Sequence, residues 1–517
     1  MKMYHKKSTI SVLLLSLLLI GVGCKNELDI NQNPNVPTYE QGTPQVVFPA
    51  GVIATVGKVG GDLTILGGIW AQNYTQSALS NQYKYIDAYD VKSTDFNASW
   101  NVLFTSGLKN YKFVLDKSRA SGDWTYFLMG AVMNAYTTAI LVDLYDKIPY
   151  SEAFQGLNNL EPKFDDGFKI YKDLISQIDT ALSKDFTAIT CSVAGTAPSY
   201  KDGTPGFVAS DLVFNGDIEQ WKAFANTLKL KLYLRMVNAQ PALARTGVMD
   251  IINSNVPLLT SDAGVSNNVQ RSTTENFVHF SDVLGKDNPF YEQNIRSLNT
   301  PDNIRASRTF ASWLVENGDP RSFFYFGSLA PNSVNQGDYN GTDASYQTAK
   351  VFVQTPTDPV LFISEAESYF LQAEAAVRYF NGTNAQNLYN SGVLSAFAVT
   401  DNDGTSFVAN GGAYAFPNAG TLEQKIEAII VQKWASFPYG CHAIEGFFEK
   451  NRTGYPRTSS VYSTDKNYVP GQFVIAKNSV LPSGQLPKRL IYPYDETSRN
   501  SNSPAIVPST TGVWWAR

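Results

Sequence analysis

The stretch from Val132 to Phe154 reads Val-Met-Asn-Ala-Tyr-Thr-Thr-Ala-Ile-Leu-Val-Asp-Leu-Tyr-Asp-Lys-Ile-Pro-Tyr-Ser-Glu-Ala-Phe. Apolar side chains recur every four residues along it, at Val132, Tyr136, Ile140 and Leu144. This spacing predicts an α-helix with one apolar stripe against the core and mixed residues on its other faces. The rest of the chain is therefore expected to pack around this helix.

The end of this helix forms a corner. Ile148 precedes Pro149, whose ring disfavours the helical conformation of the residue before it. The helix is thus expected to end near Lys147 and to turn sharply through 150–152. The segment from Asp143 to Ala153 mixes carboxylates with tyrosines, which could bind a ligand or simply hold the turn. The structural role is favoured, because these residue types are common at turns and helix ends.

The first residues have the layout of a secretory leader. Three lysines precede an apolar run from Ile10 to Ile20, and small residues follow up to Cys24. This run is too short for a membrane-spanning helix, which needs about 20 residues, so residues 1–23 are predicted to be a signal peptide. No later segment is expected to be apolar enough to span a membrane. The residues before Cys24 resemble a bacterial lipobox, which predicts acylation of Cys24; the alternative is an ordinary leader with Cys24 left free.

Composition limits the possible ligands. Removing 23 residues and their three lysines from the 517-residue chain leaves 494 residues and a formal charge of −8, against −5 for the whole. This acidity argues against nucleic acid or anionic lipid as a ligand, since both require clustered Lys and Arg. Three cysteines exclude a disulfide framework. Whether Cys191 pairs with Cys441 is left open, with two separate small apolar residues as the favoured interpretation.

Periodicity divides the remaining chain into helical pairs and a less regular middle. Residues 24–43 are expected to be a lipid-anchored tether, and 44–517 a single globule that begins with a short helix around 63–74. Helical pairs are expected at about 100–147, 164–238, 361–398 and 421–452, the last opening with a capping box at Thr421–Gln424. The insertion at about 239–360 is expected to be irregular, with short helices and a hairpin. The fold class is therefore mainly α, with four degenerate tetratricopeptide-like helix hairpins (eight helices) and a loop-rich subdomain.

Several segments in this order resemble the SusD/RagB family of nutrient-binding outer-membrane lipoproteins, specifically its SusD-like subgroup. They are Asp143–Ala153; Trp221–Leu230 with Arg235; Glu365–Arg378; Gln432–Trp434 with Glu445 and Arg452–Pro456; and Pro487, Arg489, Tyr492, Pro493, Glu496, Asn500 and Asn502. The resemblance implies eight helices in four tetratricopeptide-like units. It also implies a surface-exposed lipoprotein that acts as a lid on a TonB-dependent (SusC-like) outer-membrane transporter and is not an enzyme. The matching segments look like scaffold, so no ligand-binding residue is carried over.

Motifs for enzymatic chemistry are missing from the sequence. After the leader only His279 and His442 remain, without a His- or Cys-based metal motif, and no nucleophile elbow or phosphate loop is present. We therefore expect no metal, no cofactor and no catalytic residue, and each histidine is interpreted as a packing residue. A glycosidase needs only two carboxylates, so a surface hydrolase stays an alternative, as does a purely structural helical-repeat scaffold.

Aromatic residues outside the helical stripes are the best candidates for ligand contact, because their rings can stack on sugars or peptide side chains. The candidates are Tyr74, Tyr83, Tyr85 and Tyr325, together with the polar residue Gln72. For each of them ordinary packing is the favoured alternative. The predicted function is the capture of an oligosaccharide or oligopeptide and its delivery to the transporter.

Overall fold

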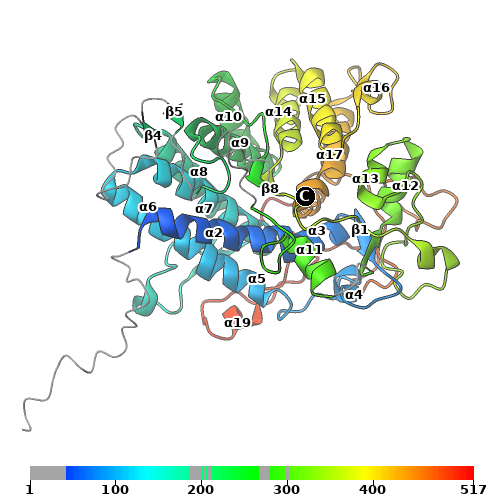
Figure 1. Cartoon of the computed structure of the whole chain (residues 1–517), viewed down its shortest axis with the longest axis horizontal. Helices are drawn as coiled ribbons and strands as arrows, with labels where there is room; N and C mark the ends of the chain where they lie inside the picture. The colour runs from blue at the N-terminus through cyan, green and yellow to red at the C-terminus, as the bar shows by residue number, and fades with distance from the viewer. Residues whose placement is uncertain (1–41, 187–199, 202–203, 206–210, 267–278, 299–301) are drawn as a thin grey trace, which may run out of the picture. The chain divides into compact units, whose positions relative to one another are not determined.

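The computed structural model describes residues 42–186, 200–201, 204–205, 211–266, 279–298 and 302–517 (Figure 1). Pro44–Arg517 forms one compact unit, and the account below concerns this unit. The predicted signal peptide, the acylated Cys24, most of the tether and Cys191 lie outside the described residues. They remain predictions.

Four pairs of helices that pack on each other form the framework of the unit, and Figure 1 labels most of them. They are α6 (Lys109–Ser121) with α7 (Trp124–Tyr145), α8 (Gly167–Leu182) with α9 (Ile218–Arg235), α14 (Glu365–Tyr379) with α15 (Ala385–Ala398), and α17 (Leu422–Ser436) with α18 (Ile444–Thr453). The predicted mainly α fold with four helix hairpins is confirmed. The capping box is present as well, since Gln424 N donates to Thr421 Oγ1 at 3.3 Å and Thr421 N to Gln424 Oε1 at 2.8 Å.

Helix α7 lies at the centre of the core. It begins at the N-cap Asp123, whose carboxylate accepts from Tyr126 N at 3.3 Å, and 20 of its 22 residues are buried. The prediction of mixed outer faces is therefore wrong, because neighbouring helices cover α7 on every side. The helix ends two residues before Lys147, where Asp146 has φ 73° and leaves the helical conformation.

Before this helix lies α2 (Pro44–Lys58), which the sequence analysis did not anticipate, followed by η1 (Val59–Leu63) and α3 (Thr64–Trp70). Pro49, Gly51 and Gly57 disfavour a helix by local propensity. Packing decides otherwise: α2 lies against α6 so closely that a Cβ on Gly51 would be 2.6 Å from the Tyr111 ring. Thr55 Oγ1 and the Tyr111 hydroxyl are also hydrogen-bonded, at 2.8 Å.

Among the described residues, two helical segments are long and apolar enough to cross a membrane, which corrects the expectation that no such segment follows the leader. They are Pro44–Trp70 and Trp124–Tyr145. Within their most apolar windows, 72% and 94% of the residues are buried inside the protein. Such burial is what core helices of a globular fold show.

Shorter elements fill the spaces around the hairpins. The first and last parts of the chain add α4 (Lys84–Asp87), α5 (Asn97–Val102), η2 (Leu103–Leu108), η3 (Gly156–Asn158), α16 (Thr405–Val408), η6 (Tyr439–Cys441) and α19 (Tyr494–Thr497). The middle of the chain adds α10 (Pro241–Asn253), α11 (Pro289–Tyr291), η4 (Glu292–Arg296), α12 (Arg308–Glu316), α13 (Arg321–Phe326) and η5 (Ala344–Thr348). The region predicted to be irregular thus contains α10, a 13-residue helix.

Four two-stranded antiparallel sheets occur among the described residues, and two of them, β1 with β7 and β6 with β8, connect distant parts of the chain. The strands are β1 (Tyr74–Gln76), β2 (Ile148–Pro149), β3 (Phe164–Asp165), β4 (Tyr200–Lys201), β5 (Thr204–Pro205), β6 (Ala263–Val265), β7 (Ile304–Ala306) and β8 (Val360–Ile363). The pairs are β1 with β7, β2 with β3, β4 with β5, and β6 with β8. The two strands of the middle region, β6 and β7, therefore pair with distant partners instead of forming the expected hairpin, a choice that local residue pattern does not encode.

A network of paired charges fills the interior between the hairpins. Its members are Asp143 on α7, Lys231 and Arg235 on α9, Glu367 and Glu374 on α14, Lys433 on α17, and Glu445, Glu449 and Arg452 on α18, all buried. Arg235 lies 2.6 Å from Glu445 and 2.9 Å from Glu449, and Arg452 lies 2.7 Å from Glu374. A buried charge is costly unless it is paired, so these contacts fix how α9, α14 and α18 fit together.

The corner after α7 is part of this scaffold. Trp515 Nε1 donates to Asp143 Oδ1 at 2.7 Å, and Trp514 N donates to Asp146 Oδ1 at 2.6 Å. Leu490 N donates to Leu144 O at 2.9 Å. The corner therefore holds the C-terminal segment against α7, which supports the structural interpretation of its carboxylates.

Candidate functional site

Gln72 joins three separate parts of the chain in the interior. It is 0% exposed, and its Nε2 donates to Val474 O at 2.6 Å while its Oε1 accepts from Val474 N at 3.0 Å and from Thr309 Oγ1 at 2.8 Å. The amide is thus satisfied by the protein itself. In this conformation a ligand from solvent has no access to it.

Tyr74 and Tyr325 are brought together, but in the core. Both rings pack on Phe352, with centroid distances of 4.8 and 5.9 Å, and their exposed fractions are 0% and 1%. The Tyr74 hydroxyl donates to Thr64 O at 2.6 Å, and the Tyr325 hydroxyl to Ala435 O at 3.3 Å. These contacts fit the packing alternative.

Tyr83 and Tyr85 flank the start of α4. Tyr83 is 7% exposed, whereas Tyr85 is half-buried. Burial, with a smaller contribution from Asp95, raises the pKa of Tyr85 to about 12, so its hydroxyl is neutral and able to donate a hydrogen bond at pH 7. Of the five candidates Tyr85 is the most accessible, and ligand contact by any of them stays a prediction.

The predicted packing role of His442 agrees with its position. It is 0% exposed and its ring lies 5.1 Å from that of Phe437, edge to face. Cys441 beside it is buried, and Asn288 Nδ2 lies 3.4 Å from its Sγ. Within the described part of the chain no group of three or more His, Cys, Asp or Glu is placed to hold a metal ion.

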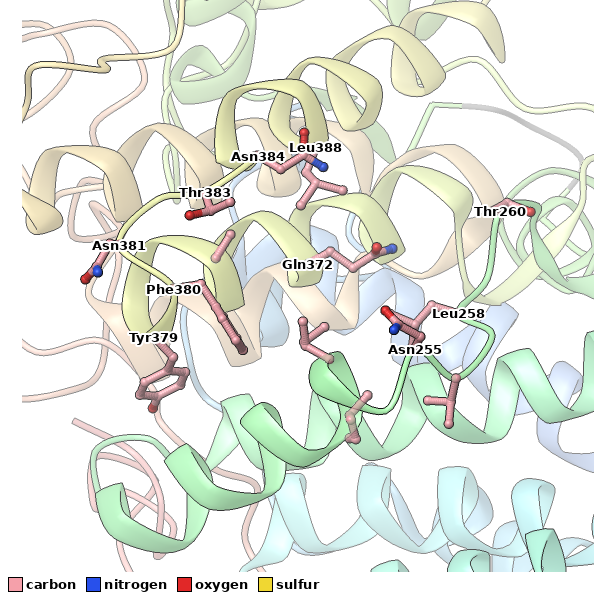
Figure 2. Close-up of a pocket in the computed structure, with 14 residues that line it drawn as sticks. Asn255, Leu258, Thr260, Gln372, Tyr379, Phe380, Asn381, Thr383, Asn384 and Leu388 are labelled. Atoms are coloured by element: carbon pink, nitrogen blue, oxygen red, sulfur yellow. The ribbon is translucent and has the colours of Figure 1, made fainter.

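A pocket of about 750 Å³ lies elsewhere, between α10, α14 and the start of α15 (Figure 2). We call it the α10–α14–α15 cleft. Its apolar lining consists of Ile251, Ile252, Val256, Leu258, Ala376, Phe380 and Leu388. Its polar lining consists of Asn255, Thr260, Gln372, Tyr379, Asn381, Thr383 and Asn384. In Figure 2 Asn381 and Tyr379 lie at one end of the cleft and Thr260 at the other.

Apolar and polar groups are arranged as in a typical small-molecule site. Ile251 and Ala376 at the floor are buried, while Asn255, Asn381 and Thr383 at the rim are exposed. The side chains of these three rim residues make no hydrogen bond to any other described residue, so their donors and acceptors are available to a ligand. No Asp, Glu, Lys or Arg belongs to the lining. The cleft thus offers aromatic and aliphatic contact together with neutral hydrogen-bonding groups.

Helix ends place the rim asparagines. Asn255 follows the end of α10, Asn381 follows the end of α14, and Asn384 is the N-cap of α15. Their φ values are 50°, 52° and 59°, a left-handed conformation that asparagine adopts more readily than other non-glycine residues. The backbone therefore explains why asparagine stands there, and it places three amides along the lining of the cleft.

The sequence analysis missed this cleft. It predicted only a helical pair at about 361–398, although the polar run 381–384 between the two helices was the available signal. The sequence does not show that residues 251–260 lie close to residues 372–388, because this proximity depends on the packing of α10 against α14.

Comparison with known proteins gives a family and a fold. Residues 68–493 match the SusD-like_2 family, described as "Starch-binding associating with outer membrane". No curated protein matches the sequence.

Solved structures resemble the chain over nearly its whole length. A Bacteroidetes SusD-like protein, AC2a, has a TM-score of 0.71 at 17% identity, covering 92% of this chain and 99% of its own. A SusD homologue from Bacteroides uniformis has a TM-score of 0.69 at 19% identity, covering 91% and 99%. A chitin-binding SusD homologue from Flavobacterium johnsoniae has a TM-score of 0.67 at 21% identity, covering 90% and 98%. Identities this low show the fold alone.

Proposed function

The chain belongs to the SusD-like family, and from this premise we propose that it captures an oligosaccharide or oligopeptide nutrient at the cell surface. We place capture in the α10–α14–α15 cleft. The observation that carries this proposal is a hollow of about 750 Å³ with an apolar floor and unengaged amides at its rim. Pockets of this size and composition bind small ligands by burying their apolar faces and bonding their polar groups.

The lining favours binding over hydrolysis. Glycoside hydrolysis needs two carboxylates placed across the scissile bond, and the cleft lining contains no acidic side chain. A ring such as Phe380 can instead stack on a sugar or on a peptide side chain, while Asn381 and Gln372 bond its hydroxyl or amide groups.

We further propose that the bound nutrient passes to a TonB-dependent, SusC-like transporter in the outer membrane, with Cys24 as the lipid anchor. The family's association with the outer membrane and the leader ending at Cys24 support this arrangement. Binding and release then need no covalent chemistry in this chain.

Calorimetry on a soluble protein lacking residues 1–24 tests the capture site. Starch and chitin oligosaccharides and a set of oligopeptides are titrated into wild type, and each mixture is assayed for breakdown of the ligand. Phe380→Ala should weaken binding roughly tenfold, since loss of an aromatic contact costs about 1 kcal/mol or more. The matched control is Phe324→Ala, whose ring on α13 is 38% exposed and outside the cleft.

Each outcome of this experiment has a clear meaning. Equal binding by wild type, Phe380→Ala and Phe324→Ala would remove the cleft as the capture site. Breakdown of a ligand would favour the hydrolase, and no binding by any probe would favour the structural scaffold. A melting curve for each variant separates lost contact from lost folding.

Gentle detergent extraction from the native membrane tests delivery. We expect a large β-barrel protein to purify with the full-length chain. Recovery of the chain alone, under conditions that preserve other outer-membrane complexes, would reduce the proposal to an anchored binding protein.

A further inference from the structure

A second hollow, of about 600 Å³, lies at the C-terminal end of α18. It is bounded by that helix end, by the loop 484–488 and by residues 510–517. Lys450, Lys488 and Arg517 contribute to its lining, and no Asp or Glu does. We call this pocket the basic hollow. It concentrates three basic side chains on a chain whose net formal charge is −5.

None of these three cations forms an ion pair with a carboxylate side chain of the described residues. Lys488 Nζ donates to Arg517 O at 2.9 Å, and Arg517 Nη1 donates to Thr453 O at 3.1 Å. Two N–H donors of Lys488 and most of those of Arg517 therefore stay available. If the Arg517 oxygen belonged to a terminal carboxylate, two of the three positive charges would still have no anionic partner.

Lys450 is held at the base of the basic hollow by neutral groups. Its ammonium group donates to Gly454 O at 2.9 Å, to Thr458 Oγ1 at 2.8 Å and to Pro456 O, and lies 4.9 Å from the centre of the Phe473 ring. Burial lowers its pKa to about 7. The carbonyl end of α18 offsets part of its charge, but no carboxylate does. An anion in the hollow would stabilise the charged form.

The contrast with the rest of the interior is informative. Arg235 and Arg452 are buried and each lies within 3 Å of two carboxylates. Repulsion among unpaired cations costs free energy, and the positive potential that they create attracts anions. Three basic side chains without a carboxylate partner therefore form a site that a bound anion would stabilise.

We propose that the basic hollow binds an oxyanion, a carboxylate or sulfate group, either free or carried by an acidic sugar. The volume admits a sugar-sized group, and Arg517 and Lys488 supply the charged donors that carboxylates and sulfates accept from. The site is distinct from the uncharged α10–α14–α15 cleft and does not depend on the function proposed for that cleft.

Titration calorimetry at low ionic strength tests the basic hollow. The probes are glucuronate, glucose 6-sulfate, inorganic sulfate and, as the neutral match, glucose. We expect wild type to bind at least one anionic probe and to bind it more weakly as NaCl is added, because salt screens exposed charges. Inorganic sulfate binding as tightly as glucose 6-sulfate would identify the free anion as the ligand, whereas tighter binding of the sugar would identify an acidic glycan.

Charge-neutralising variants locate the binding. Lys488→Gln and Arg517→Gln should each weaken anion binding roughly tenfold, the size of one lost charged hydrogen bond, and Lys488→Arg should retain it. Lys466→Gln is the matched control, since Lys466 is an exposed lysine outside the hollow that forms no ion pair with a described residue. Arg517 is exposed, so its substitution leaves the fold intact.

Two results would overturn the proposal. One is the absence of binding by every anionic probe, and the other is equal anion affinity in wild type and in the double variant of Lys488 and Arg517. Phe380→Ala should leave anion binding unchanged, so failure in the neutral cleft and failure in the basic hollow are told apart.

Discussion

Buried polar atoms in this interior divide into those that the protein satisfies and those that it does not. Thr55 and Tyr111 share a hydrogen bond of 2.8 Å, and Tyr74 reaches a carbonyl. The Tyr136 hydroxyl, by contrast, is buried without a hydrogen-bond partner among the described residues. Residue type alone does not distinguish these cases, since all three tyrosines are buried. Removing a hydroxyl that has a hydrogen-bond partner should cost stability, whereas removing one without a partner should not, so substitution tests the role of each atom.

Tyr136 separates the contribution of a ring from that of a hydroxyl. Its ring lies 4.9 Å from that of Phe362 and is 2% exposed. Tyr136→Ala should lower the free energy of unfolding by about 3 to 5 kcal/mol, as loss of a large buried side chain does. Tyr136→Phe should change it by less than about 1 kcal/mol, because no protein hydrogen bond is lost. Urea unfolding followed by circular dichroism measures both.

Either of two results would count against this view of α7. A large destabilisation by Tyr136→Phe would show that the hydroxyl has a partner. A normal melting curve for Tyr136→Ala together with lost ligand binding would show that the region is a binding site.

His442 gives stability a dependence on pH. Burial lowers its pKa from 6.5 to about 4, so between these values the unfolded chain binds a proton that the folded protein excludes. Stability therefore falls as pH drops from 6.5 towards 4. The shift corresponds to about 3 kcal/mol, as an order of magnitude.

Buried acidic residues extend this loss of stability to lower pH. Burial alone would raise the pKa of Glu445, but Lys231 and Arg235 outweigh it and hold the value at about 2. The stability that this carboxylate contributes is fully present above 4.5, its pKa in the unfolded chain. It is lost as pH falls towards 2, its pKa in the folded protein. Melting temperatures of wild type and His442→Gln between pH 7 and 4 test the histidine: the variant should show the flatter slope, and equal slopes would contradict its role.

Whole helices were largely predictable from sequence, and the exceptions have identifiable causes. The helical pairs predicted at about 100–147, 164–238 and 421–452 are present, because apolar residues recur there with helical spacing. Helix α2 was missed because Pro49 and two glycines lower its local helix propensity. Of the two glycines, Gly51 is explained by its close contact with the Tyr111 ring. The local sequence pattern shows which face of a helix is apolar. It does not show which neighbouring helix that face will contact closely.

Two glycines measure this dependence. A Cβ on Gly67 in α3 would lie 2.2 Å from Ile444 Cα in α18, whereas a Cβ on Gly57 in α2 would meet nothing within 4 Å. Gly67→Ala should therefore cost about 1 to 3 kcal/mol through overpacking. Gly57→Ala should be neutral or stabilise by up to about 1 kcal/mol, since alanine favours the helix. Chemical denaturation compares the two, and similar effects would show that α3 and α18 can separate without cost.

At the scale of the whole molecule, the architecture was predictable from sequence, whereas the cleft was not. The five predicted contact residues do not line the cleft. Tyr74 and Tyr325 pack in the core, in line with the packing alternative that was favoured for them. The cleft joins two segments more than a hundred residues apart. The residues that face each other there follow from how α10 packs on α14, which no local pattern records.

Anchoring by Cys24 is also a prediction about the whole molecule. Acyl chains each contribute about 0.8 kcal/mol per buried CH₂, and two or more give stable attachment. Cys24→Ala should therefore appear in the soluble fraction or keep its leader. Cell fractionation followed by mass measurement of the N-terminus checks this. A variant held in the membrane as tightly as wild type would contradict acylation as the anchor.

A crystal structure of the soluble protein with the oligosaccharide or oligopeptide that binds most tightly in calorimetry tests the central claim most directly. The account predicts the ligand in the α10–α14–α15 cleft, with an apolar face on Phe380 and polar groups bonded to Asn381 or Gln372. An ordered ligand bound elsewhere, for instance against Tyr85, with the α10–α14–α15 cleft empty, would contradict it.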